Sequence, residues 1–344
     1  MLEEILVTAR HNPKIDPFLE IWTWEISVYL FLGGLTAGIM FFSALMNLMQ
    51  KGQEAPFARN QLALWAPVVL SVGMATLFLD LEHKLYVFRF YTTFEPTSPM
   101  SWGAWILIFI YPISVLQILS SLRRGYPLFA SYVDRSAIGR WVLDVTERFR
   151  KVFAVLSIPF AVALGIYTGI LLSAFSARPF WNTGILGPLF LVSGLSTAAA
   201  FAVLFARERV EKHLFTQIDL GLIGTELVIV ALWLINLGTG AEPQLAALRQ
   251  ILGGEYTVMF WGFFVAVGLL IPLGLELLEL GAGERTLAVL GPVLVLVGGY
   301  VLRHVTVEAG QVTSWIDYES EFNTQLLRRL TREPGAPGSP GFSE

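Results

Sequence analysis

The chain has 344 residues, of which 55% are hydrophobic and 15% are charged, and its formal net charge is −4. Soluble domains carry about 25% charged residues, so this composition is typical of a membrane protein. The absence of cysteine excludes disulfides, cysteine-ligated iron–sulfur clusters and thioether-attached haem within this chain. The acidic balance provides no basic surface for nucleic acid, so we expect no nucleic-acid partner.

Apolar segments recur along the whole chain, and each can cross a hydrocarbon core about 30 Å thick. Their apolar residues run continuously instead of alternating, which favours helices over barrel strands. The sequence therefore predicts an all-α polytopic membrane protein with eight transmembrane helices arranged as two four-helix bundles. The expected helices are 21–49, 61–82, 101–122, 152–175, 184–206, 216–238, 257–280 and 286–305. Two glycine pairs at i, i+4 spacing, Gly34 with Gly38 and Gly165 with Gly169, predict seams of close helix packing.

Three regions follow from these helices: an N-terminal segment at 1–20, the membrane domain at 21–305, and a C-terminal tail at 306–344 that is disordered at its Pro- and Gly-rich end. Eight crossings place both termini on one side, here called side A, and the opposite side is side B. The side-B loops at 123–151 and 207–212 are richer in Lys and Arg than the side-A loops. The positive-inside rule then predicts that side B faces the cytoplasm and that both termini are extracytoplasmic. The 123–151 segment is predicted to lie on the membrane surface as an amphipathic piece.

Polar residues of five predicted helices converge on side A. An ionisable residue at the bilayer centre costs about 2.5–3.5 kcal/mol on insertion scales, so its position is informative. Glu25 and Tyr29 share one helix face by their i, i+4 spacing. This convergence predicts a site for a lipid-soluble molecule, and the alternative is that the polar groups only cap helix ends or snorkel. The residues concerned are Glu25, Tyr29, Asp80, Glu82, His83, Lys84, Arg89, Tyr167, Asn182, Asn236, Arg303 and His304.

Further carboxylates lie deeper in the predicted helices. Glu226 is in mid-helix, and Glu276 and Glu279 lie near side B. Together with Asp80 they could form a proton route. The alternative is that Glu226 is neutral and hydrogen-bonded to a neighbouring helix.

Histidines leave little scope for a metal site or a haem. The chain has four, and His83 and His304 are the one pair expected at the same membrane face. Both lie at helix ends, where a buried axial ligand pair is not expected. We therefore predict no metal site and no haem.

Motifs at the side-A positions resemble the NrfD-like family of membrane subunits, which includes the membrane subunit of polysulfide reductase. The matching motifs span residues 22–311 and cover nearly all of the membrane region. They are WTWE at 22–25, YLFLGGLTAG at 29–38, LDLEHK at 79–84 with Arg89, SPMSWG at 98–103, YTGILL at 167–172, PFWNT at 179–183, RH at 303–304 and AG at 309–310.

The resemblance implies a haem-free subunit that binds menaquinone or ubiquinone as its substrate. It also implies an extracytoplasmic partner subunit with four iron–sulfur clusters, connected to a molybdopterin catalytic subunit or a multihaem cytochrome. Some members carry Asn and His in the first helix where this chain has Ile26 and Tyr29. Tyr29 can still donate a hydrogen bond to a quinone oxygen, Glu25 could take the proton, and His83 could replace the missing imidazole.

We therefore predict a quinol-binding membrane subunit of a multi-subunit oxidoreductase, with proton translocation left open. It would not be catalytic alone, and it would exchange electrons with the iron–sulfur partner on side A. The predicted catalytic residues are Glu25, Asp80 and His83, and the predicted quinone contacts are Tyr29, Arg89, Tyr167, Asn182, Arg303 and His304. The alternatives are a secondary transporter of a small solute or ion and a purely structural membrane anchor.

Overall fold

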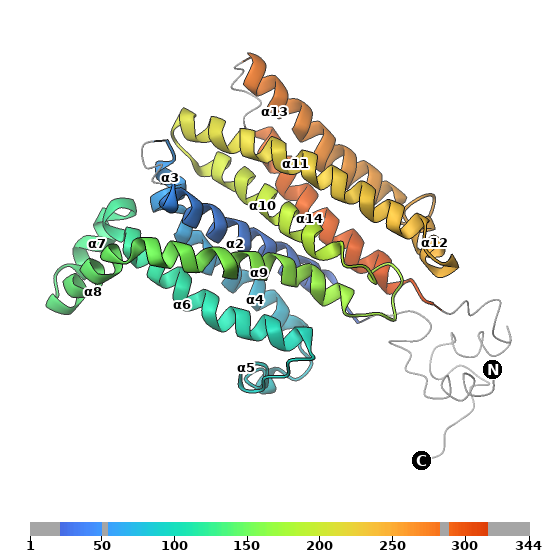
Figure 1. The fold of residues 1–344 in the computed structure, drawn as a ribbon, viewed down its shortest axis with the longest axis horizontal. Coiled ribbons are helices and arrows are strands. Elements are labelled where there is room, and N and C mark those ends of the chain that lie inside the picture. Colours follow the sequence, from blue (N-terminus) through green and yellow to red (C-terminus); the bar gives the residue numbers. More distant parts are fainter. Residues whose placement is uncertain (1–20, 50–53, 283–288, 316–344) are drawn as a thin grey trace.

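The computed structural model describes residues 21–49, 54–282 and 289–315. Within these ranges every regular element is helical, and eight helices are long and apolar enough to cross a membrane (Figure 1). The predicted all-α, eight-span class is therefore confirmed. The segment at 1–20 and the Pro- and Gly-rich end of the tail lie outside the described residues.

The spans pack as two groups of four. The first bundle contains α2 (Trp24–Leu48), α4 (Trp65–Asp80) with the short η1 (Leu62–Leu64) before it, α6 (Pro99–Gly125) and α9 (Arg150–Ser173). The second contains α10 (Leu186–Phe205), α11 (Arg209–Gly238), the wide helical segment η3 (Val258–Leu270) that continues into α13 (Ile271–Ala282), and α14 (Leu290–Gln311). The bundles join where α10 packs on α2 and α9 and where α14 packs on α2.

Small residues allow the two bundles to approach each other. A Cβ atom added at Gly38 of α2 would overlap the carbonyl oxygen of Gly194 and the Cβ of Ala198, both on α10. A Cβ at Gly169 of α9 would overlap the carbonyl oxygen of Leu186, at the start of α10. Both predicted glycine pairs thus lie in seams against α10, where van der Waals contact between backbones replaces side-chain packing.

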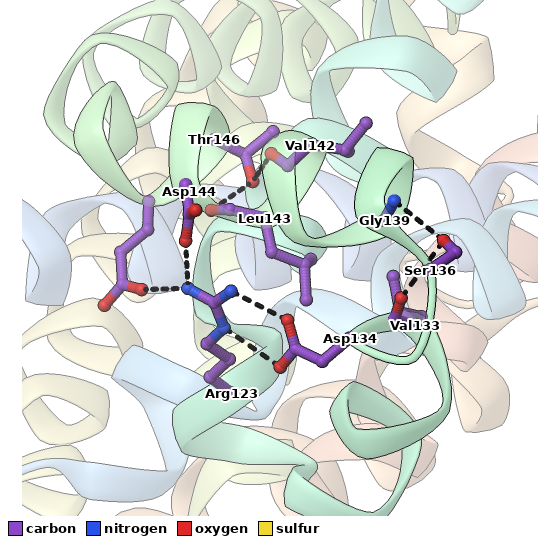
Figure 2. A network of polar contacts seen from close by, with 10 residues as sticks. Arg123, Val133, Asp134, Ser136, Gly139, Val142, Leu143, Asp144 and Thr146 are labelled. Atoms are coloured by element: carbon purple, nitrogen blue, oxygen red, sulfur yellow. Dashed lines mark hydrogen bonds and ion pairs between the residues drawn. The ribbon is translucent and has the colours of Figure 1, made fainter.

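Short helices cap the two ends of the bundles. On side A lie η2 (Lys84–Tyr86), α5 (Arg89–Thr92) and α12 (Glu242–Arg249), and on side B lie α3 (Pro56–Asn60), α7 (Pro127–Val133) and α8 (Ala137–Arg148). In Figure 1 α3, α7 and α8 lie at one end of the bundle and α12 and α5 toward the other. Helices α7 and α8 form the expected surface piece on the end of α6. Arg123 of α6 holds this piece by ion pairs to Asp134 at 2.7 Å and Asp144 at 2.6 Å (Figure 2).

Polar contacts extend two of the spans beyond the ends that hydropathy predicts. Helix α11 begins at Arg209, before the expected residue 216, because the buried Glu211 carboxylate accepts hydrogen bonds from the backbone N–H groups of Phe57 (3.1 Å) and Ala58 (2.7 Å). Helix α14 continues to Gln311, beyond the expected end at 305. The Gln311 amide bonds both the N–H and the carbonyl of Trp22, at 2.9 and 2.8 Å. Polar anchors of this kind are invisible to a hydropathy window.

We expect Gly38→Val to lower the free energy of unfolding by about 1–3 kcal/mol, because the new side chain has to force the α2–α10 seam apart. The measurement is the thermal unfolding midpoint of the purified protein in detergent. Gly221→Val is the matched control, since Gly221 lies on the exposed side of α11 with nothing within 4 Å of an added Cβ. Equal shifts in the two variants would contradict the role of the seam.

Candidate functional site

A cavity of about 330 Å³ lies in the side-A half of the first bundle. It is lined by the first turns of α2 and α6 and by the last turns of α4 and α9, and residues of α5 and of the turn before it complete the lining. On α2 the lining residues are Trp22, just before the helix, and Ile26 and Tyr29, whose spacing places them on one face. The lining is predominantly apolar, and four polar side chains reach it: Tyr29, Asp80, Tyr91 and Tyr167.

Two phenols meet inside this cavity. Tyr29 of α2 and Tyr167 of α9 are 4% and 5% exposed, and their hydroxyl groups are within hydrogen-bonding reach of each other. Gly103 of α6 makes room for the pair, because a Cβ there would overlap the ring and hydroxyl of Tyr167. Three helices therefore fix the position of the phenol pair, and this explains the glycine in the SPMSWG motif.

A carboxylate stands at the side-A end of the same cavity. Asp80 is the last residue of α4, and it is half-buried in the lining. The side chains of Glu25 and Glu82 lie close enough to interact electrostatically with it. Glu25 does not line the cavity itself, and its carboxylate accepts a hydrogen bond from the Thr23 hydroxyl. These carboxylates form a series from the cavity to the side-A surface.

Tyr91 of α5 is a lining residue that sequence patterns did not indicate. Burial raises the pKa of its phenol, and nearby Tyr111 raises it further. The group therefore stays protonated at physiological pH and can donate a hydrogen bond into the cavity. No spacing rule marked Tyr91, because it lies in a loop helix outside the predicted spans.

The cavity opens on an apolar surface. Phe78 of α4, Phe90 of α5 and Met100 of α6 line it and are also solvent-exposed. The opening of the cavity is therefore apolar, which suits the entry of an apolar molecule.

Three of the predicted site residues lie on the surface and do not line the cavity. His83 and Arg89 are exposed, since the extended backbone of Leu81 ends α4 and turns the chain outward. The Arg89 guanidinium lies 4.6 Å from the centroid of the Tyr86 ring. Asn182 is exposed in the loop between α9 and α10.

Arg303 and His304 of α14 also lie outside the cavity lining. Arg303 is fully buried in the second bundle, where it donates hydrogen bonds to the Ser193 hydroxyl (2.7 Å) and to the carbonyls of Gly299 (2.8 Å) and Phe190 (3.0 Å). The Nδ1 atom of His304 is 3.5 Å from the Ser27 hydroxyl of α2. Helical spacing could not specify that these two side chains lie outside the cavity.

The second bundle contains a group of buried carboxyl side chains. Glu226 interacts with Arg303 and with Ser193. Asp219, which sequence patterns did not single out, accepts a hydrogen bond from Ser196 at 2.6 Å.

Asp219 also lies close enough to Glu276 of α13 to interact with it. One oxygen of each carboxyl group has no donor among the described residues, and two such groups can hydrogen-bond to each other only when one of them carries a proton. Glu279 lies further toward side B, near Lys212 and His213. Of the predicted proton route, Glu226, Glu276 and Glu279 thus share the second bundle, whereas Asp80 belongs to the first.

The eight spans define a multi-pass helical membrane protein with a cavity near one membrane face. The family model described as "Polysulphide reductase, NrfD" matches residues 10–314, so the chain belongs to the NrfD family and the resemblance seen in its motifs is confirmed.

Relatives align over most of the chain. Protein NrfD of Escherichia coli (strain K12) is 28% identical, with 85% of this chain and 96% of the relative covered. A polysulfide reductase chain of Wolinella succinogenes is 26% identical, with 85% and 94% covered. A tetrathionate reductase subunit of Salmonella typhimurium is also 26% identical, with 69% and 65% covered. By these names, the family supplies subunits to reductases.

We expect Gly103→Ala to weaken binding of a short-chain quinone analogue about tenfold, because the added methyl group displaces the Tyr167 phenol and disrupts one neutral hydrogen bond to the ligand. The measurement is a binding titration on the purified protein in detergent. Gly274→Ala is the control, since an added Cβ there meets nothing within 4 Å. Wild-type affinity in Gly103→Ala would show that Tyr167 does not contact the ligand.

Proposed function

We propose that this chain is the quinol-binding membrane subunit of a reductase complex, with menaquinone or ubiquinone as its substrate in the side-A cavity. The observation that carries the proposal is the Tyr29–Tyr167 phenol pair together with Asp80 in one apolar cavity that opens toward lipid. A quinone has an apolar ring and tail and two oxygens that need hydrogen-bond partners. The cavity supplies both kinds of surface.

Oxidation of a quinol releases two electrons and two protons. Tyr29 and Tyr167 hold the ring by hydrogen bonds to its oxygens, and Tyr91 adds a third donor. Asp80 accepts the two protons one after the other and passes each toward Glu25 and the side-A surface. In the reverse direction the same groups supply the protons, so the site itself does not set the direction of electron flow.

The electrons require a partner protein. The chain has no cysteine with which to ligate an iron–sulfur cluster. We propose that a four-cluster iron–sulfur subunit docks on side A and passes electrons to a molybdopterin catalytic subunit or a multihaem cytochrome. Relatives named as subunits of polysulfide, selenate and tetrathionate reductases support such a complex.

Side A offers an exposed surface for that partner. Leu85, Phe88 and Phe94 are exposed beside the cavity, and His83 and Arg89 lie among them. In this proposal the side chains of His83 and Arg89 contact the partner subunit and do not contact the quinone. The excess of Lys and Arg at side B supports an orientation in the bacterial inner membrane with side B cytoplasmic.

We expect Tyr29→Phe and Tyr167→Phe each to lower quinol turnover by the purified complex about tenfold, because each removes one hydrogen bond of roughly 1–1.5 kcal/mol from a buried site. The assay follows quinol oxidation with the complex's own acceptor. Tyr132→Phe is the control, since Tyr132 is exposed on side B. Unchanged turnover in both cavity variants would show that the phenol pair is not part of the quinol site.

Two further measurements distinguish this proposal from a transporter and from a structural anchor. Solute uptake by the isolated chain in liposomes would favour a transporter. A complex that assembles normally but neither binds nor oxidises quinol would favour a structural anchor.

We further propose that the second bundle conducts protons. Ser193 and Ser196 lie one turn apart on α10, and they connect the Arg303–Glu226 pair with the Asp219–Glu276 pair. Ionisable groups buried at membrane depth are costly unless they are paired, and they often mark ion pathways. Glu279 would connect this series to side B, and Asp80, which lies in the first bundle, would not belong to it.

We expect Asp219→Asn to lower the number of protons translocated per electron in proteoliposomes, since the amide keeps hydrogen bonds but cannot exchange a proton. Quinol turnover with uncoupler should stay within about twofold, because the substitution lies outside the quinol cavity. Glu208→Gln, an exposed carboxylate on side B, serves as the control. A wild-type proton ratio in Asp219→Asn would exclude Asp219 from the route.

A further inference from the structure

A second cavity, of about 220 Å³, lies at the opposite end of the first bundle from the quinol cavity. Five elements contribute to its lining: the side-B ends of α2 and α6, helix α3, the end of α8 and the start of α9. The lining residues are Asn47, Arg59, Arg124, Glu147, Arg148, Arg150 and Lys151. No part of the proposed quinol chemistry uses them.

Positive charge is in excess around this cavity. Five of the lining side chains are cationic and one is acidic. The Glu147 carboxylate already forms ion pairs with Arg124 at 2.6 Å and with Arg123 at 3.5 Å. Burial lowers the pKa of Arg59, and the like charge of Arg124 lowers it further. An anion in the cavity would relieve this repulsion.

Arg150 lines the cavity and has two donor atoms without an acceptor. Its side chain is buried, with the residue only 7% exposed, and its Nη2 atom donates to the Arg59 carbonyl and to the Asn60 amide oxygen, both at 2.8 Å. The Nε and Nη1 atoms are buried without a hydrogen-bond acceptor among the described residues. Leaving donors of a charged group buried and unpaired is costly, so the guanidinium is held in place for an acceptor that the chain does not provide.

We propose that this cavity binds the phosphate group of an anionic membrane phospholipid. A phosphodiester offers two acceptor oxygens that match the planar fork of a guanidinium, and lysine adds a point charge beside it. Basic pockets between the cytoplasmic ends of transmembrane helices are suited to such headgroups.

The surface next to the cavity favours a lipid over a soluble phosphate. Helix α9 runs from the cavity into the membrane, and its residues Val152, Val155 and Leu156 are all exposed. Val155 lies one turn after Lys151 on the same helix face. A lipid whose phosphate is bound by Arg150 and Lys151 would therefore have an apolar surface for its acyl chains.

The test uses the full chain, purified in detergent and stripped of lipid, in native mass spectrometry titrations. The probes are dioleoylphosphatidylglycerol, dioleoylphosphatidylcholine and inorganic phosphate. We expect one phosphatidylglycerol to bind about tenfold more tightly than phosphatidylcholine, whose choline cation opposes the positive site. Excess inorganic phosphate should leave that lipid bound. Displacement by inorganic phosphate at similar affinity would overturn a lipid in favour of a soluble anion.

Variants assign the binding to this cavity. Arg150→Gln should weaken phosphatidylglycerol binding about tenfold, since it removes the charge and the unpaired donors. The double variant Arg148→Gln/Lys151→Gln alters exposed side chains only, so it tests the site even where Arg150→Gln fails to fold. Arg207→Gln, an exposed arginine on side B outside the cavity, is the control. Wild-type affinity in the double variant, or an equal loss in Arg207→Gln, would overturn the proposal.

Discussion

The close contact between α2 and α10 determines how the rest of the molecule is arranged. Lipid tails are as apolar as the helix surfaces, so helices in a membrane associate through packing and not through exclusion of water. Gly38 lets the α10 backbone approach α2 at Gly194 and Ala198. This seam joins the two bundles and brings α14 against α2 as well. The cavity on one side and the buried carboxyl groups on the other are both positioned by it.

Polar side chains are distributed differently in the two bundles. In the first bundle, polar side chains are concentrated at the two ends: phenols and carboxylates around the side-A cavity, and arginines around the side-B cavity. In the second bundle they lie in the interior and interact with one another, as Arg303 does with Ser193. A charge inside a membrane is tolerated only when it is paired or functional. This difference is the reason that we propose ligand sites in the first bundle and proton transfer in the second.

Hydropathy predicted every span, because a continuous apolar run has one stable conformation in a bilayer. It could not predict where α11 begins or α14 ends, since Glu211 and Gln311 set those limits through contacts with distant backbone. For the site, the sequence indicated how far along its helix each residue lies, and Tyr29, Tyr167 and Asp80 do line one cavity. The sequence could not indicate the direction of each side chain, because that direction depends on how the helices rotate and where they end. That is why His83 lies outside the cavity, and why no sequence pattern indicated Tyr91 or Asp219.

Helix α2 contacts two helices of the second bundle, α10 and α14, and is therefore placed to couple the two bundles. Tyr29 on α2 faces the cavity and the Tyr167 phenol. Slightly more than one turn later, a Cβ at Gly34 would be only 2.9 Å from the Arg303 Nη2 atom, which belongs to the buried polar series of the second bundle. A sub-ångström shift of α2 would therefore alter the phenol pair and the surroundings of Arg303 together, because packed interfaces move as units and do not deform continuously. If quinol oxidation drives protons through this protein, α2 provides a direct mechanical connection between the two events.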